Sequence, residues 1–156
     1  MMTIRPATID DRMGLLELVA LQENFTAAEK EIAREVIEDS LFERDDYLLL
    51  VASAEKDELI AFVCYGPIPM TESSFDLYWI ATAPAHGRQG VASQLLGAME
   101  ASLGKSAKAV VYVDTSSTPG YARARAFYEK NGYQIAARLR DFYKTGDDRM
   151  IYRKEL

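Results

Sequence analysis

The chain has 156 residues, one histidine, one cysteine and a formal net charge of −6, and 49% of its residues are hydrophobic. This length fits a single domain that can bury a core without a disulfide framework or a structural metal. The acidic balance, with no basic stripe interleaved with aromatic residues, argues against a nucleic-acid-binding protein. A single thiol and the lack of an apolar signal region after Met1 predict a cytoplasmic protein, and no apolar window is long enough to span a membrane.

The hydrophobic pattern predicts alternating strands and helices with no linker, so we expect one α/β domain over residues 1–156. The expected strands cover residues 3–6, 47–54, 59–65, 75–82, 108–114, 133–141 and 149–154. The expected helices begin near Thr8, near Thr26, at Val91 and after Thr118, which we expect to cap the last helix. The helix from Val91 places Val91, Leu95, Met99 and Leu103 on one apolar face.

Three polar or reactive features receive structural interpretations. Cys64 lies in an apolar run and is expected to be a buried strand residue, since no His or Asp neighbour marks it as a nucleophile. His86 has no catalytic partner in the sequence and is expected at the surface. Asp147 and Asp148 follow Gly146 and predict a hairpin turn, because no third ligand for a metal ion is apparent.

The stretch Trp79–Leu96 carries the strongest functional signal. An apolar strand ends at Pro84, a loop with Gly87 and Gly90 follows, and Val91 opens a helix. A helix N-terminus presents unpaired N–H groups and a partial positive charge. The two glycines allow the backbone to approach a bulky anion such as a pyrophosphate, although they could also serve only a tight turn.

A second motif follows one helix and one strand later, in the segment Tyr121–Tyr133. The residues that define this motif are Ala124, Phe127, Tyr128, Glu129, Lys130, Gly132 and Tyr133. Together with Gly90-Val91-Ala92, this segment resembles the two signatures of the GNAT-type N-acetyltransferases, and the resemblance extends over essentially the whole chain. It implies a GNAT fold, with a mixed central sheet of about seven strands flanked by about four helices, and it implies acetyl-coenzyme A as the donor.

The resemblance implies which residues bind the coenzyme. They are Ile80, Ala81, Thr82, Gly87, Arg88, Gln89, Gly90, Val91, Ala92, Ser93, Tyr121 and Tyr128. Two positions depart from the family pattern. Gly87 stands where a Gln or Arg is usual, with Arg88 and Gln89 beside it, and Tyr121 replaces an asparagine seven residues before the tyrosine.

The family chemistry gives each catalytic group a place in this sequence. Backbone N–H groups near Ile80 and Ala81 would stabilise the developing oxyanion, which requires that this strand edge is not fully paired. Tyr128 would be the general acid that protonates the departing thiolate. Asp76 occupies the position of the catalytic glutamate of histone-type members and is the candidate base, with Glu72 and Asp114 as reserves.

The resemblance implies a small-molecule or peptide amine as the acceptor. An acidic surface could also attract a cationic amine, or it could simply be a solvated surface. The expected acceptor-binding residues are Asn24, Phe25, Tyr78, Asp114, Phe142 and Tyr143, with the segment 142–148 treated as a loop. No metal is needed. A homodimer is possible, since dimers are the commonest oligomers. Two alternatives remain open: a non-catalytic acyl-coenzyme A-binding module on the same fold, and a nucleotide-binding α/β domain, which would lack its usual acidic residue after the loop.

Overall fold

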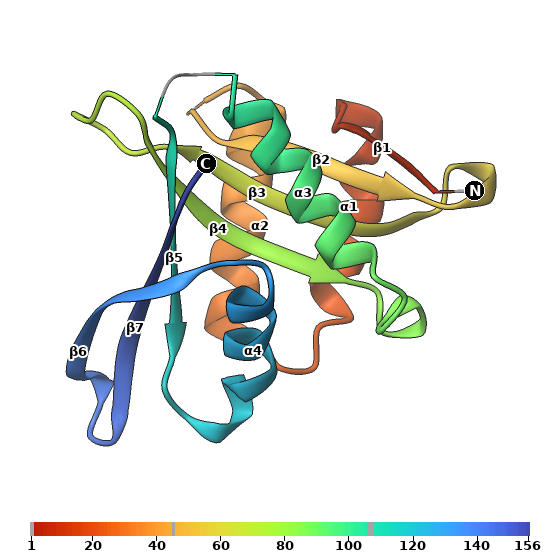
Figure 1. Ribbon diagram of the computed structural model, residues 1–156. Helices are drawn as coiled ribbons and strands as arrows, with labels where there is room; N and C mark the ends of the chain where they lie inside the picture. The colour runs from red at the N-terminus through yellow and green to blue at the C-terminus, as the bar shows by residue number, and fades with distance from the viewer. Residues whose placement is uncertain (1, 45, 106–107) are drawn as a thin grey trace.

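The computed structural model describes residues 2–44, 46–105 and 108–156. The strands are β1 (Thr3–Pro6), β2 (Leu48–Ser53), β3 (Leu59–Pro67), β4 (Ser74–Thr82), β5 (Val110–Ser116), β6 (Gln134–Lys144) and β7 (Asp147–Glu155). The helices are α1 (Arg12–Ala20), α2 (Ala27–Leu41), α3 (Val91–Leu103) and α4 (Ala122–Lys130). The strands form one sheet in the order β1-β2-β3-β4-β5-β7-β6, with β4 and β5 parallel and the other neighbours antiparallel. Within the described residues this mixed sheet confirms the expected fold (Figure 1).

Helices cover both faces of the sheet where β2, β3 and β4 lie side by side. Helices α1 and α2 pack on one face and α3 packs on the other (Figure 1). The four apolar positions of α3 predicted from their spacing, Val91, Leu95, Met99 and Leu103, are all buried. Burying a side chain of this size contributes about 1.5–3 kcal/mol relative to exposure, so this face of α3 fixes the helix on the sheet.

Strand β3 is buried on both sides because it lies between these two helical layers. Val63 and Tyr65 belong to the core under α3, whereas Phe62 and Cys64 belong to the core under α1 and α2. Cys64 is fully buried, and burial raises the pKa of its thiol to about 12. This confirms that Cys64 is a structural strand residue, since the thiolate needed of a nucleophile is disfavoured there.

The parallel pair β4–β5 is short. Only Ser74, Phe75 and Asp76 of β4 pair with β5, at Val110, Val111 and Tyr112. Beyond Asp76, β4 stays paired with β3 and β5 stays paired with β7, so the two strands separate (Figure 1). A bulge opposite Cys64 and Tyr65 inserts Tyr78 as an extra residue in β4, and bulges bend a strand in this way. The expectation of an incompletely paired edge before the glycine loop is confirmed.

The C-terminal hairpin differs from the expected one. Residues 142–148 are not a loop, because β6 continues to Lys144 and β7 begins at Asp147. Thr145 and Gly146 form the turn, with Gly146 at a φ of +81°. The sequence reading missed this because a bulge between Leu139 and Lys144 interrupts the regular alternation of β6.

The Thr118 hydroxyl and the Asp148 carboxylate, both near this hairpin, also have roles that the sequence did not predict. The Thr118 hydroxyl makes no cap hydrogen bond and instead pairs with the Ser116 hydroxyl at 2.8 Å. The Asp148 carboxylate accepts from the Asp141 N–H at 2.9 Å and from the Arg138 guanidinium, which fixes the bulge. Asp147 and Asp148 therefore belong to β7 and not to the turn.

No helix in the described part of the chain has the length and apolar character needed to cross a membrane.

We predict opposite stability effects for two glycine-to-alanine variants. A Cβ at Gly66 in β3 would lie 2.7 Å from the Asp46 carbonyl oxygen, so Gly66→Ala is expected to destabilise the fold by about 1–3 kcal/mol. A Cβ at Gly97 in α3 meets no atom within 4 Å, so Gly97→Ala is expected to stabilise the fold by about 0.5–1 kcal/mol. Denaturant unfolding of both variants measures this. Equal effects at the two sites would contradict the close approach of β3 to the segment before β2.

Candidate active site

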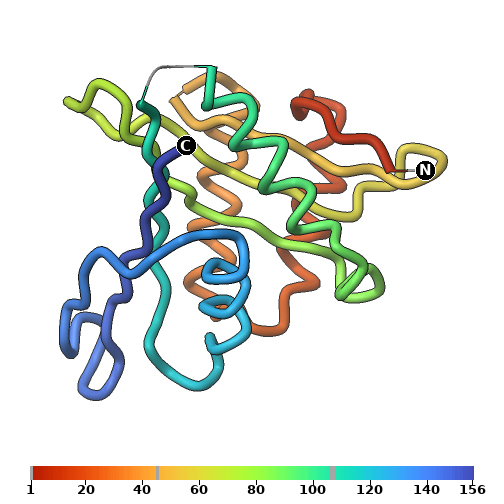
Figure 2. Tube along the Cα trace, in the orientation of Figure 1, coloured from red at the N-terminus to blue at the C-terminus, as the bar shows by residue number. Residues whose placement is uncertain are grey.

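Two cavities meet beside the separated end of β4. The first has a volume of about 440 Å³ and the second about 870 Å³. Both are lined by Asn24, Ile80, Ala124 and Tyr128. These shared residues come from the α1–α2 connection, from β4 and from α4, so all three elements meet at the junction (Figure 2). We call the larger cavity the loop groove and the smaller one the inner cavity. The two form one continuous cleft.

The glycine loop forms one wall of the loop groove. Gly87, Arg88, Gly90, Val91, Ala92 and Ser93 line it. Gly90 has a φ of +76° and is the N-cap of α3, with no side-chain cap hydrogen bond. Among the described hydrogen bonds, none uses the N–H of Arg88, Gln89 or Gly90. The first N–H groups of α3 have no intrahelical acceptor either, so this wall presents a set of free donors to an anion.

Basic side chains add positive charge to the same groove. Arg88 comes from the loop, and Arg123 and Lys130 come from α4. Gly87 stands where the family usually has Gln or Arg, and the neighbouring Arg88 lines the groove. Gln89 does not line it. The sequence reading overlooked Arg123 and Lys130. Their spacing around Phe127 places all three on one helix face, which was the signal available in the sequence.

Hydrogen bonds hold the walls of the loop groove at a fixed separation. The Asn131 side-chain amide at the end of α4 donates to the Ser93 hydroxyl in the first turn of α3 at 3.4 Å. The buried Gln22 amide donates to the Leu18 carbonyl at 3.0 Å and to the Thr82 carbonyl at 3.1 Å. These contacts tie α4 to α3 and tie the end of α1 to the end of β4.

The open edge of β4 points backbone donors at the junction. The Ala83 N–H donates to the Ile60 carbonyl of β3 at 2.7 Å. Because N–H groups alternate along an antiparallel strand, the Ala81 N–H also faces β3, while those of Ile80 and Thr82 face the unpaired edge. Ile80 lines both cavities, and Ala81 lines neither. Of the two expected oxyanion donors, only Ile80 is placed for that role.

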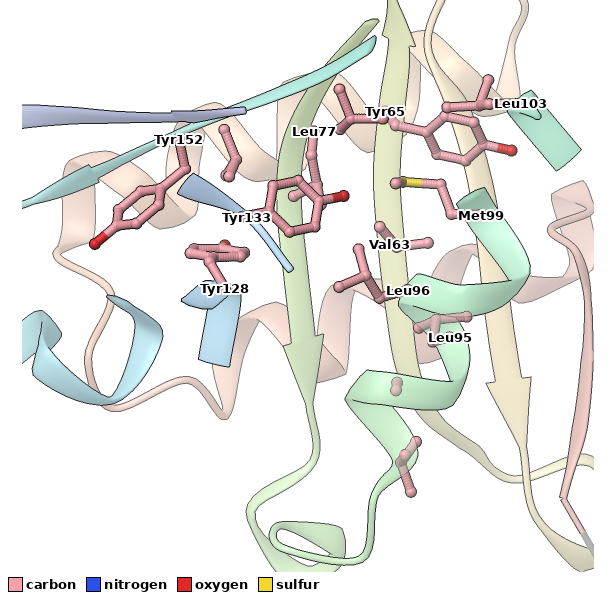
Figure 3. Packing of buried hydrophobic residues seen from close by; sticks show 14 of the residues in the cluster. Val63, Tyr65, Leu77, Leu95, Leu96, Met99, Leu103, Tyr128, Tyr133 and Tyr152 are labelled. Atoms are coloured by element: carbon pink, nitrogen blue, oxygen red, sulfur yellow. The ribbon is translucent and has the colours of Figure 1, made fainter. Parts of the chain in front are cut away.

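Tyr128 is the buried polar side chain at the junction. Its neighbours Tyr121, Tyr133 and Tyr152 donate to Glu29, Glu100 and Glu129, whereas none of the described hydrogen bonds involves the Tyr128 hydroxyl. Tyr128 is 7% exposed and its ring contacts that of Phe127. It also packs against Tyr133 and Tyr152 (Figure 3).

The Tyr128 hydroxyl nevertheless reaches open space. Among the described residues, no fully enclosed side-chain oxygen or nitrogen lacks a hydrogen-bond partner, so this hydroxyl must open into the cleft that its side chain lines. Burial raises its pKa above the usual value, so the phenol keeps its proton at neutral pH. A protonated, unpartnered hydroxyl can donate a proton to a group bound in the cleft.

The inner cavity is acidic and aromatic. Its carboxylates are Glu29, Asp114 and Asp147. Its aromatic side chains are Phe25, Tyr78, Trp79, Tyr121, Tyr128 and Tyr143. The Tyr121 hydroxyl donates to Glu29 at 3.1 Å, the Ser116 hydroxyl donates to Asp147, and the Arg149 Nε donates to Asp114 at 2.7 Å.

Asp76 lies where β4 and β5 begin to separate. It is paired with Gly66 on β3 and with Tyr112 on β5. Partial burial raises the pKa of its carboxyl, the Asp114 charge raises it further, and Arg149 opposes the shift. Asp76 does not line the inner cavity, whereas Asp114, held in reserve as a base, does.

The structure brings most of the expected acceptor-binding residues together. Asn24, Phe25, Tyr78, Asp114 and Tyr143 line the inner cavity. Phe142 does not, because its ring lies 4.9 Å from the Arg149 guanidinium on an exposed part of β6.

Three further placements differ from the sequence reading. Tyr121, expected to contact the coenzyme, lines the inner cavity and not the loop groove. Glu29, to which the sequence analysis gave no site role, and Asp147, which it placed in a turn, both line the inner cavity. Among the described residues, no group of three His, Cys, Asp or Glu side chains is placed to hold a metal ion.

Comparisons with known proteins agree with this geometry. A family model described as an acetyltransferase (GNAT) domain matches residues 45–135. A solved structure from Desulfovibrio desulfuricans, assigned to the GNAT acetyltransferase family, is 32% identical in sequence. The alignment covers 99% of each chain with a TM-score of 0.93.

Two further solved structures share the fold at lower identity. The PaiA N-acetyltransferase of Thermoplasma acidophilum, solved with coenzyme A, is 20% identical over 100% of this chain and 99% of the other, with a TM-score of 0.75. The aminoglycoside 6'-N-acetyltransferase of Enterococcus faecium is 16% identical over 98% and 96%, with a TM-score of 0.76. No curated protein sequence matches this chain significantly. The family match over more than half of the chain and the full-length likeness at 32% identity establish that the chain belongs to the GNAT acetyltransferase family.

Proposed function

We propose that this protein is an N-acetyltransferase that transfers the acetyl group of acetyl-coenzyme A directly to an amine while both substrates are bound. One observation carries the proposal: a groove lined by free backbone donors and basic side chains meets an acidic cavity at the unpartnered Tyr128 hydroxyl. An anionic donor and a cationic acceptor would thus meet at one protonated group.

The loop groove fits the donor. Free N–H groups around Gly90 and at the start of α3, with Arg88 and Arg123 on facing walls, suit a pyrophosphate. The donor supplies the activated acetyl thioester. The solved Thermoplasma PaiA structure of the same fold holds coenzyme A, which supports this assignment of the groove.

The acetyl transfer makes one bond and breaks one. The acceptor nitrogen, as the neutral amine, forms a bond with the acetyl carbonyl carbon, and the bond between that carbon and the coenzyme sulfur breaks. The Ile80 N–H at the open edge of β4 donates to the carbonyl oxygen as negative charge develops there, which is typically worth about 10²-fold or more in rate. The proton of the Tyr128 hydroxyl passes to the departing sulfur, and solvent then restores it.

A base must remove one proton from the acceptor nitrogen. Asp76 is our candidate, because burial raises the pKa of its carboxyl and so increases its basicity. Since Asp76 does not line the inner cavity, the proton would travel through water. Asp114 lines the cavity, but its ion pair with Arg149 favours a role in binding charge.

We predict that Arg123→Gln weakens coenzyme A binding several-fold and leaves pantetheine binding unchanged. Pantetheine lacks the phosphates that Arg123 would contact, so the two ligands separate phosphate recognition from general damage to the groove. Calorimetric titration of both ligands measures this. The control is Arg44→Gln, since Arg44 is exposed and lines neither cavity. An equal loss for both ligands would contradict the assigned role of Arg123.

We predict that Tyr128→Phe lowers kcat by about 10²–10⁴-fold and leaves the affinity for coenzyme A nearly unchanged, because only the proton donor is removed. Thiol release in the presence of an amine panel measures kcat. The matched control is Tyr152→Phe, which removes a neighbouring phenol that donates to Glu129 at 3.0 Å and lines neither cavity. We expect Tyr152→Phe to lose about 1 kcal/mol of stability and to retain activity.

Two outcomes would contradict this account. Full activity in Tyr128→Phe would remove the tyrosine from the chemistry. Saturable coenzyme A binding without acetyl transfer to any amine in the panel would favour the non-catalytic acyl-coenzyme A-binding module.

A further inference from the structure

We infer that the acceptor is a small dicationic molecule, with one amine that is acetylated and a second positive group held by Glu29 and Asp147. This inference rests on the proposed function, because it concerns the acceptor side of the same cleft. Three features of the inner cavity support it: its charge balance, its aromatic lining and the position of its carboxylates relative to the junction.

Among the described residues, neither Glu29 nor Asp147 forms an ion pair. Glu29 accepts from the Tyr121 hydroxyl and Asp147 accepts from the Ser116 hydroxyl, and both donors are neutral. The third carboxylate, Asp114, has its own cation in Arg149. Burial raises the pKa of the Tyr143 hydroxyl, the charges of Asp114, Asp147 and Glu29 raise it further, and Arg149 opposes the shift, so three carboxylates share one electrostatic environment with a single cation. Two uncompensated negative charges in a half-buried space favour a cationic ligand.

The aromatic lining suits a cation on an aliphatic stem. Phe25, Trp79, Tyr121 and Tyr143 surround the same space as the carboxylates. Aromatic faces attract ammonium groups, and their apolar area accepts methylene groups. A cavity of about 440 Å³ also has the size of a small-molecule site.

The carboxylates of Glu29 and Asp147 lie away from the point at which the reacting amine must bind, so they would hold a second positive group of the ligand. The reacting nitrogen must lie at the junction, where Ile80 and Tyr128 line both cavities. Glu29 and Asp147 line only the inner cavity, so they lie away from the loop groove. The Tyr128 hydroxyl, which lacks a partner among the described hydrogen bonds and opens into the cleft, marks the junction end. A ligand that satisfies both ends therefore carries a nitrogen at the junction and a second positive group deeper in the cavity.

The test compares putrescine with n-pentylamine, in which a methyl group replaces the second ammonium at nearly the same length. Each amine is titrated calorimetrically into the protein saturated with coenzyme A, and kcat/KM is measured with acetyl-coenzyme A. We expect putrescine to bind at least tenfold more tightly than n-pentylamine. We expect Glu29→Gln and Asp147→Asn each to reduce this ratio several-fold, and the control Glu35→Gln, an exposed residue of α2, to leave it unchanged.

The binding arm tests the inference independently of turnover. Selective putrescine binding that depends on Glu29 and Asp147, but without acetylation, would uphold the dicationic site and overturn the proposed function. Equal binding of the two amines would overturn the dicationic site even if both are acetylated. A ratio that both variants leave intact would likewise overturn the assignment of Glu29 and Asp147.

Discussion

Beyond Asp76, β4 has no strand on its β5 side, and the cleft depends on this separation. Strand β3 holds one edge of β4 and β7 holds β5, so each strand remains anchored while the space between them opens. The bulge at Tyr78 bends β4, and α4 lies across the opening (Figure 1). A backbone donor at Ile80 and the Tyr128 side chain are brought together only because the ladder stops there. Continued pairing of β4 with β5 would consume that donor and close the cleft.

Charge divides the cleft into two halves although the chain as a whole is acidic. Arg88, Arg123 and Lys130 line the loop groove with one carboxylate, Glu23, whereas the charged residues that line the inner cavity are the carboxylates Glu29, Asp114 and Asp147. The net negative charge of the protein is therefore not distributed evenly over its surface. The division orients an anionic donor and a cationic acceptor toward the same point, and electrostatic interactions gain strength there because the site is partly buried.

The local motifs predicted much of the fold and the place of the glycine loop between β4 and α3. The glycine loop and the apolar spacing of α3 come from short-range pattern, and both were correct because neighbouring residues decide them. Glu29 was missed because its contact with the Tyr121 hydroxyl spans 92 residues of sequence, and Asp147 because its contact with the Ser116 hydroxyl spans 31. The segment around Phe142 was misread as a loop because a bulge hides strand periodicity. Contacts between residues far apart in the sequence decide the places of Glu29, Asp147 and Phe142, and local sequence patterns do not show such contacts.

The central claim is that the loop groove binds the coenzyme of an acetyl donor. Calorimetric titration of the purified protein with acetyl-coenzyme A, coenzyme A and NAD tests it most directly, since all three carry a pyrophosphate. We expect saturable binding of acetyl-coenzyme A and coenzyme A and no binding of NAD. Binding of NAD in their place would support a nucleotide-binding domain, and no binding of coenzyme A would mean that the groove lacks the proposed role.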